Sequence, residues 1–388
     1  MGVERLVKRL GGEARCRIGE SADFTLRFFD SFDWRLHEAG LRLLQLRSPQ
    51  GAVLRLKSAE AGDPLDAVAF DAEPAWPADL PESQLKTEVE KRLAMRVLLP
   101  VATVTGEATD LALLNEDAKT VVRLQFLAMR CDAEGIDEPR VLWPRLRLLP
   151  VKGYQRDLSD FRDFLAGEME WPEAPECLFD EVVTAVGREP GDYSSKLDVS
   201  LRPDQTAVDA TRKVLRSLLN TLERNIPGTR ADLDSEFLHD LRVATRRTRS
   251  ALSQVKQVLP EDVVVDFKQR FAWLGQVTGP VRDLDVFLLE LPRYRASLPS
   301  SMAGDLDGLE EHLLIAHGKE QASLKRKLGS AEMRKLVEDW HKVLEPDTLP
   351  GEPAPLAELP IGQVASNRIW RMYKKVLKAG RAVTADGP

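Results

Sequence analysis

The chain has 388 residues, 43% of them apolar, and a formal net charge of −7 at pH 7. Its length favours two domains over one, and its negative charge argues against a general nucleic-acid binder. The cysteines Cys16, Cys131 and Cys177 are far apart and form no C-x-x-C pair, so neither a disulfide framework nor a structural zinc site is expected. No apolar run approaches the ~18 residues that span a bilayer, and we expect a cytoplasmic protein without membrane contact.

The first half of the chain predicts an α+β domain dominated by antiparallel strands. Apolar residues alternate there with basic or polar ones, as is typical of half-buried strands, at residues 26–33, 53–57, 120–129 and 141–151. Helices are predicted at 156–168 and around 176–187. This half is also acidic, because residues 1–200 carry 26 basic and 36 acidic side chains, against 29 and 26 in residues 201–388.

From Pro203 onward the apolar spacing becomes helical. A first helix is expected to end near Pro227-Gly228, and the next to begin with Asp234 or Ser235 as its N-cap. Further helices are predicted at residues 262–276, 280–290, 304–328, 331–343 and 361–380. The segment 189–204 has the composition of a linker, so we place a boundary near residue 200, between an α+β domain at 1–199 and an all-α domain at 200–388.

The segment 236–251, E-F-L-H-D-L-R-V-A-T-R-R-T-R-S-A, concentrates positive charge on one helix. At about 100° per residue, His239, Arg242, Arg246 and Arg249 share an arc of roughly 80°, and Arg247 lies toward one flank. The final helix repeats this spacing with its cations Arg368, Arg371, Lys374, Lys375 and Lys378. A guanidinium group offers a planar fork of donors that matches phosphate oxygens, so the two stripes predict a site for a phosphate-bearing anion.

The simpler interpretation is a solvated helix face whose cations are balanced by neighbouring acids, which is commonplace for a single helix. Here the acids Asp234, Glu236 and Asp240 lie near the helix start, where they complement the helix dipole, and no acid follows before Glu261. Nucleic acid is the rival polyanion. Because single-strand readers interleave aromatic and basic residues, and Trp370 and Tyr373 are expected to pack inside, nucleic acid is not the expected partner.

These basic segments resemble the CHAD domain, the conserved-histidine α-helical domain. The resemblance rests on H-D-L-R-V-A-T-R-R-T-R-S-A-L (239–252) followed by L-G-Q-V-T-G-P-V-R-D-L-D-V-F-L (274–288). It implies a helical bundle that binds inorganic polyphosphate on a basic surface. By this resemblance the phosphate contacts would come from His239, Arg242, Arg246, Arg247 and Arg249. Arg282 would contribute nearby, and Asp283 or Asp285 would orient basic side chains.

The family domain is an internal duplication, with a second His/Arg helix after a helix like 366–380. The sequence ends about where that second copy is expected to begin, so the resemblance covers only the first half of the domain. Half of such a groove is expected to bind polyphosphate more weakly than a whole one.

The first half of the chain resembles a CYTH domain, the triphosphate tunnel fold. The segments that carry the resemblance are F-F-D-S-F-D-W-R-L-H-E-A-G-L (28–41), M-R-V-L-L-P-V-A-T-V (95–104), D-A-K-T-V-V-R-L (117–124), R-L-R-L-L-P-V-K-G-Y (145–154) and S-S-K (194–196). The resemblance implies a closed antiparallel barrel whose interior cations hold a triphosphate and whose carboxylates hold magnesium or manganese. This division follows the general preference of hard divalent ions for carboxylates.

Two departures from the tunnel pattern predict a degenerate site. The family's E-x-E-x-K motif is absent, since V-E-R-L-V-K at 3–8 does not fit its spacing, and Leu44 stands where a tunnel arginine is expected. Leucine at an inward position indicates a barrel that fills with core. The candidate phosphate ligands that remain, each of which could equally be an exposed strand cation, are Lys57, Lys119, Arg123, Arg145, Arg147 and Lys196.

The sequence therefore predicts a cytoplasmic polyphosphate-binding protein, associated with polyphosphate granules, that requires no cofactor for binding and is not an enzyme. The alternative is an inorganic triphosphatase that uses the tunnel with magnesium or manganese. A second rival is a module that binds an acidic protein or RNA through the same basic surface.

Overall fold

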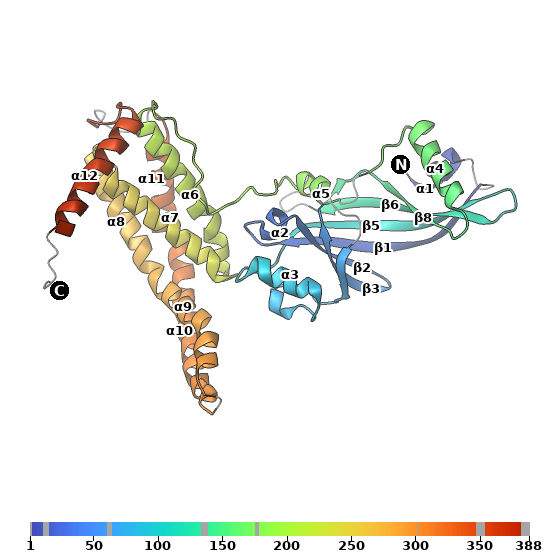
Figure 1. Ribbon diagram of the computed structural model, residues 1–388, viewed down its shortest axis with the longest axis horizontal. Helices are drawn as coiled ribbons and strands as arrows, with labels where there is room; N and C mark the ends of the chain where they lie inside the picture. The colour runs from blue at the N-terminus through green and yellow to red at the C-terminus, as the bar shows by residue number, and fades with distance from the viewer. Residues whose placement is uncertain are drawn as a thin grey trace. The chain divides into compact units, whose positions relative to one another are not determined.

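The computed structural model describes residues 2–10, 15–59, 64–132, 139–174, 178–299, 301–346 and 354–381. The chain forms two compact units, Met1–Tyr193 and Ser194–Pro388, each of which is described by itself (Figure 1). The division falls inside the segment 189–204 in which the linker was expected.

The first unit is built on an antiparallel sheet with the strand order β4-β3-β2-β1-β5-β6-β7, and β8 also pairs with β6. The strands are β1 (Cys16–Asp30), β2 (Leu41–Ser48), β3 (Gly51–Ser58), β4 (Pro64–Ala69), β5 (Leu99–Leu114), β6 (Thr120–Asp132), β7 (Arg140–Val141) and β8 (Arg145–Pro150). Among the described strands, no pairing joins β4 to β7 or β8, so backbone hydrogen bonds leave the sheet open.

Helices cover both faces of this sheet. They are α1 (Val3–Arg9), α2 (Arg35–Glu38), α3 (Gln84–Leu93), α4 (Gln155–Gly167) and α5 (Phe179–Ala185), with a short 3₁₀ turn η1 (Pro77–Asp79). Because side chains alternate along a strand, Leu124 and Phe126 of β6 pack with α1 and α4, whereas Met129 packs with α5 on the opposite face. The predicted helix around 176–187 corresponds to α5, and its residues 176–177 lie outside the described residues.

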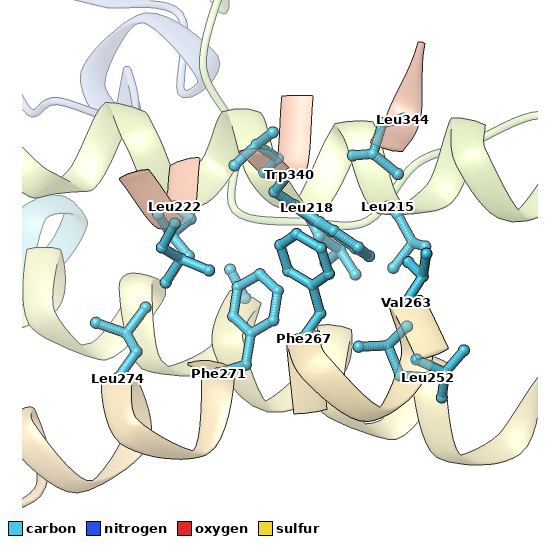
Figure 2. Close-up of a cluster of buried hydrophobic side chains, with 14 of the residues drawn as sticks. Leu215, Leu218, Leu222, Leu252, Val263, Phe267, Phe271, Leu274, Trp340 and Leu344 are labelled. Carbon is cyan, nitrogen blue, oxygen red and sulfur yellow. The ribbon is translucent and has the colours of Figure 1, made fainter. Parts of the chain in front are cut away.

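The second unit is a bundle of α6 (Ala207–Ala231), α7 (Ser235–Gln254), α8 (Glu261–Val277), α9 (Gly279–Ser297), α10 (Asp307–Leu328), α11 (Ala331–Leu344) and α12 (Ile361–Arg381), with a 3₁₀ turn η2 (Ala303–Leu306). Figure 2 shows its core, in which Leu215, Leu218 and Leu222 of α6 meet side chains of α8 and α11. Trp340 is fully buried there and lies 4.4 Å from Phe267 between ring centroids. The paired helices α9 and α10 lie side by side in Figure 1.

The prediction that the first helix ends near Pro227-Gly228 is wrong, because α6 continues to Ala231 with Pro227 inside it. Gly228 is needed at this point for a packing reason. A β-carbon on Gly228 would lie 2.3 Å from the ring of Phe237, so only glycine allows α7 to approach α6 this closely.

The predicted fold class, an antiparallel α+β unit followed by an all-α unit, is confirmed. In the part of the chain that the structure describes, none of the helices combines the length and the apolar character that crossing a membrane requires.

Candidate anion-binding surface

The helix α7 begins as predicted. The Asp234 side chain accepts hydrogen bonds from the backbone N–H groups of Glu236 (2.9 Å) and Phe237 (3.2 Å), which makes it the N-cap. The apolar positions Leu238, Leu241 and Leu252 are buried in the bundle core. This burial fixes the rotation of α7 and leaves its arginines on the remaining surface.

Arg242 is the anchored member of the predicted stripe. Its Nη1 atom donates to the Gly275 carbonyl (3.0 Å) and to Thr278 Oγ1 (2.9 Å), at the junction of α8 and α9. Burial lowers the pKa of Arg242, and the nearby guanidinium groups of Arg282 and Arg246 lower it further. A guanidinium held in place beside two others is a preorganised partner for an anion.

Two arginines of α7 lie against glycines at the junction of α8 and α9. A β-carbon on Gly275 would lie 3.3 Å from Arg249 Nη1, and one on Gly279 would lie 3.8 Å from Arg242 Nη1, which is an ordinary van der Waals distance. The guanidinium groups of Arg242 and Arg249 therefore lie close to the same helix junction.

Arg282 joins the same surface from α9, where its Nη1 donates to the Ser235 carbonyl at 3.4 Å. We define the α7 basic face as Arg242, Arg246, Arg249 and Arg282. Of the two acids expected to orient cations, Asp283 raises the pKa of Arg242, whereas Asp285 accepts a hydrogen bond from His317 Nε2 instead (2.9 Å).

Two residues of the predicted site, Arg247 and His239, do not belong to the α7 basic face. Arg247 donates to the Ser195 carbonyl at 3.3 Å, because its position on the helix turns it away from the arc of Arg242 and Arg246. His239 is half-buried near the start of α7. The structure therefore brings together the arginines of the predicted arc and directs Arg247 to another side of the helix.

The final helix, α12, contacts the bundle at one end only. Arg368 is half-buried and donates to Gln254 Oε1 at the end of α7 (3.1 Å), whereas the described residues from Ile369 onward are exposed. The expectation that Trp370 and Tyr373 pack inside is wrong, since they are 56% and 51% exposed and stack on each other instead. Lys374 lies over the Trp370 ring, and the exposed cations Arg371, Lys375 and Lys378 continue along the helix.

The α7 basic face and the cations of α12 share one electrostatic property. In the described part of the chain, no carboxylate oxygen lies within 4.0 Å, the limit for an ion pair, of the charged nitrogen atoms of these residues. Other arginines of the same unit are paired: Arg295 contacts Asp307 (2.5 Å) and Glu310 (2.7 Å), and Arg270 contacts Asp339 (3.0 Å). Other cations of the unit, such as Lys268 and Lys335, also lack an ion pair among the described residues, so what distinguishes this surface is that several unpaired arginines lie close together.

A second basic site lies in the first unit, inside the curve of the sheet. A cavity of about 550 Å³ is lined by residues of β1, β2, β3, β5, β6 and β8, which include the predicted ligands Lys57, Arg145 and Arg147. Arg55 also lines it and was not predicted. Its signal was available, because Arg55 is two residues from Lys57 on the same strand and therefore shares its face.

Three of the predicted tunnel cations do not line this cavity. Lys119 lies in the exposed β5–β6 turn and pairs with Asp117 (3.3 Å). Arg123 is on the same face of β6 as Gln125, but it is exposed beyond the lining residues. Lys196 belongs to the second unit. The segment V-E-R-L-V-K at 3–8, which does not fit the spacing of the family motif, belongs to the helix α1.

The cations that line the cavity differ in the side chains with which they pair. Arg145 pairs with Glu181 of α5 (3.0 Å), and Arg147 donates to Gln125 (3.4 Å), which in turn donates to Asp110 (3.1 Å). Partial burial lowers the pKa of Arg147, and the nearby Arg55 guanidinium lowers it further. Leu44 is buried in a cluster with Phe28 and Phe179, as expected for a core position, but it also lines the cavity, so core does not fill this part of the sheet completely. Within the described residues, no group of three metal-ligating side chains is assembled.

Comparisons with known proteins identify one domain. A family model described as the CHAD domain matches residues 213–388, so the second unit carries a CHAD domain. No curated protein matches the sequence.

Solved structures give more distant likenesses. The CHAD domain from the plant Ricinus communis is 21% identical with a TM-score of 0.40, and the match covers 50% of this chain and 62% of that one. PptA from Streptomyces chartreusis is 17% identical with a TM-score of 0.35, covering 44% and 60%. A protein from Hippeastrum, named as an adenylyl cyclase with a dominant triphosphatase activity, is 14% identical with a TM-score of 0.31, covering 49% and 92%. The chain thus spans about six tenths of the CHAD-domain structure from Ricinus.

Proposed function

We propose that the second unit binds inorganic polyphosphate on the α7 basic face. The observation that carries this proposal is the convergence of Arg242, Arg246 and Arg282 without a carboxylate partner among the described residues. Such a cluster costs self-repulsion, which a bound polyanion removes. Arg242 is already fixed by its hydrogen bonds to the α8–α9 junction, so less side-chain entropy is lost when phosphate binds.

Polyphosphate suits this surface better than a small anion. Each guanidinium can donate two parallel hydrogen bonds to phosphate oxygens, and the arginines are spread over two helices, so one chain of phosphates can contact them in succession. Contacts of this kind add along the polymer. Affinity should rise with polymer length and fall steeply with salt, because bound counterions are released.

The test is the affinity of the full chain for labelled long-chain polyphosphate, measured by fluorescence polarisation at moderate salt. We expect the double variant Arg242→Ala/Arg246→Ala to lose about 100-fold or more, because each charged hydrogen bond contributes roughly 1.5–3 kcal/mol. The matched control is Arg293→Ala/Arg295→Ala, which removes the same charge from cations already paired with Glu290, Asp307 and Glu310. Equal losses in the two double variants would contradict the site assignment.

RNA is the rival ligand that this assay must separate. The exposed, stacked pair of Trp370 and Tyr373 beside Lys374 gives α12 a surface on which bases could stack. Polyphosphate should displace single-stranded RNA at a far lower phosphate concentration. If RNA is the tighter ligand, and Trp370→Ala weakens it, the surface is a nucleic-acid interface instead.

A second candidate function is inorganic triphosphate hydrolysis in the cavity of the first unit. The observation in its favour is the collection of Arg55, Lys57, Arg145 and Arg147 around one cavity that also contains the carboxylates Glu20, Asp23 and Asp110. Phosphate release from tripolyphosphate with magnesium or manganese, lost on Lys57→Ala and retained in Arg130→Ala, would support it. Absence of release with either metal would exclude it.

A further inference from the structure

The cavity of the first unit has an apolar floor. Phe24 and Leu26 of β1, Leu46 of β2 and Leu127 of β6 line it, and all four are only half-buried. Phe24, Leu26 and Leu127 pack against a buried cluster that includes Phe28 and Leu44, which also line the cavity, so the floor is continuous with a hydrophobic core. These side chains face the cavity because they occupy alternate positions on their strands.

Cations lie beside this floor and come from opposite sides of the strand order. Arg55 belongs to β3 and Arg147 to β8, yet the Arg55 charge is close enough to lower the pKa of Arg147. In the described part of the chain, no carboxylate pairs with Arg55. The lining acids Glu20, Asp23 and Asp110 come from β1 and β5, and none of them pairs with Arg55 or Arg147.

The cavity, of about 550 Å³, therefore has two kinds of lining, because about half of its lining residues are polar or charged and the others are apolar. A ligand with an apolar body and an anionic head would match both kinds of lining. An inorganic triphosphate that filled the cavity would bring some of its oxygens against Phe24, Leu26 and Leu127, which offer no hydrogen bond to replace water.

We propose that the cavity binds an amphipathic organic anion, with an apolar body on the Phe24–Leu127 floor and one carboxylate or phosphate head between Arg55 and Arg147. This site is separate from the α7 basic face, so the inference does not rest on polyphosphate binding. It is an alternative to the second candidate function above, and competition with tripolyphosphate separates the two.

The experiment is calorimetric titration of the full chain with octanoate, decanoate and dodecanoate below their micelle concentrations, and with dodecyl phosphate as the second head group. Contact with the apolar floor should increase affinity about tenfold for every two added methylenes. Dodecanoate binding with little response to dodecyl phosphate identifies a carboxylate site, and the reverse identifies a phosphate-monoester site.

Matched variants locate the site. Arg55→Gln should weaken the preferred ligand about tenfold or more, because a charged donor to its head is lost. Arg130→Gln is the control, since Arg130 is exposed on the opposite face of β6 from Gln125 and Leu127. Trp370→Ser, which removes an exposed aromatic side chain of the second unit, should also leave the affinity for the preferred ligand unchanged. Circular dichroism of each variant shows whether the fold is retained, and Arg55→Lys, which keeps a charged donor, should retain more affinity than Arg55→Gln.

The proposal would be overturned if neither ligand class binds, or if the affinity does not depend on the length of the alkyl chain. Loss of binding in Trp370→Ser would also overturn it. So would displacement of dodecanoate by tripolyphosphate at a lower concentration than decanoate needs. Polyphosphate affinity should be unchanged in Arg55→Gln, which distinguishes failure of this proposal from failure of the proposed function.

Discussion

The two units use arginine in different ways. In the first unit, Arg96 is fully buried and pairs with Asp33 (3.3 Å), and Arg42 is buried over the Phe179 ring, 4.4 Å from its centroid. In the second unit, Arg246 and Arg249 are exposed on α7 without a carboxylate partner in the described residues. Buried, partnered arginines stabilise a fold, whereas an exposed cluster without partners costs stability that a ligand can return.

Some arginines of the first unit also lack a carboxylate partner among the described residues, and Arg55, Arg123 and Arg130 are examples. Of these three, Arg55 resembles the α7 basic face most, because it lies near another arginine, Arg147. The proposals above assign ligand contacts to arginines of both units that lack a carboxylate partner among the described residues. The predictions below test this distinction.

The largest expected effect is on a buried pair of the first unit. Asp33→Ala leaves Arg96 buried without its carboxylate, which should lower the free energy of unfolding by about 3–5 kcal/mol. Asp163→Ala, on the exposed face of α4, is the control and should change it by less than about 0.5 kcal/mol. Chemical denaturation measures both. Arg246→Ala should change the free energy of unfolding as little as the control does, while it weakens polyphosphate binding. A large loss of stability in Arg246→Ala would contradict the difference between the arginines of the two units.

The next effect is a pH dependence in the first unit. Burial raises the pKa of Asp30 from 3.8 to about 6, despite hydrogen bonds from the backbone N–H groups of Leu36 and His37. A raised pKa means that the folded state binds the proton more tightly. The stabilisation is therefore complete below the ordinary value and is lost as pH rises through about 6, by on the order of 3 kcal/mol.

Asp30→Asn should abolish this dependence between about pH 4 and pH 7, because asparagine does not titrate. Hydrogen exchange of the α2 backbone, compared between the variant and the unmodified chain at each pH, measures it locally. Parallel pH profiles for the two proteins would show that Asp30 is not the titrating group.

A smaller effect tests how α7 is held in the second unit. Gly228→Ala should lower the free energy of unfolding by about 2 kcal/mol, since the added β-carbon overlaps the Phe237 ring. Gly318→Ala, in α10, is the matched control because no atom lies within 4 Å of its β-carbon position. It should be neutral or slightly stabilising. Thermal unfolding of both variants gives the comparison, and equal midpoints would contradict the close approach of α6 and α7.

The smallest effect concerns the contact between α9 and α10. The hydrogen bond with Asp285 (2.9 Å) raises the pKa of His317, and the Asp232 carboxylate raises it further. The stabilisation of the folded state by protonated His317 is complete below about pH 6.5, and it is lost as the pH rises through the higher pKa of the folded state. His317→Gln should remove this loss and exposed His312→Gln should not, as measured by denaturation between about pH 6 and pH 8.

Local sequence was sufficient where short-range physics decides the structure. The Asp234 N-cap, the rotation of α7 and the burial of Leu44 follow from side chains that act within one turn or one strand pair. The helices beyond residue 203 follow from apolar spacing, and only the end of α6 at Pro227 was misplaced. That error arose because packing of α6 on α7 outweighs the cost of one proline in a helix.

By itself, therefore, the sequence determined two units of different class and one arginine arc in the second. The tertiary structure alone decided that Arg247 leaves this arc for Ser195, that Trp370 and Tyr373 stay exposed, and that Arg55 of β3 approaches Arg147 of β8. The reason is range. Helix and strand periods fix which face a side chain occupies, whereas the neighbours of that face come from residues far away in the chain, and these set whether a charge is paired or available to a ligand.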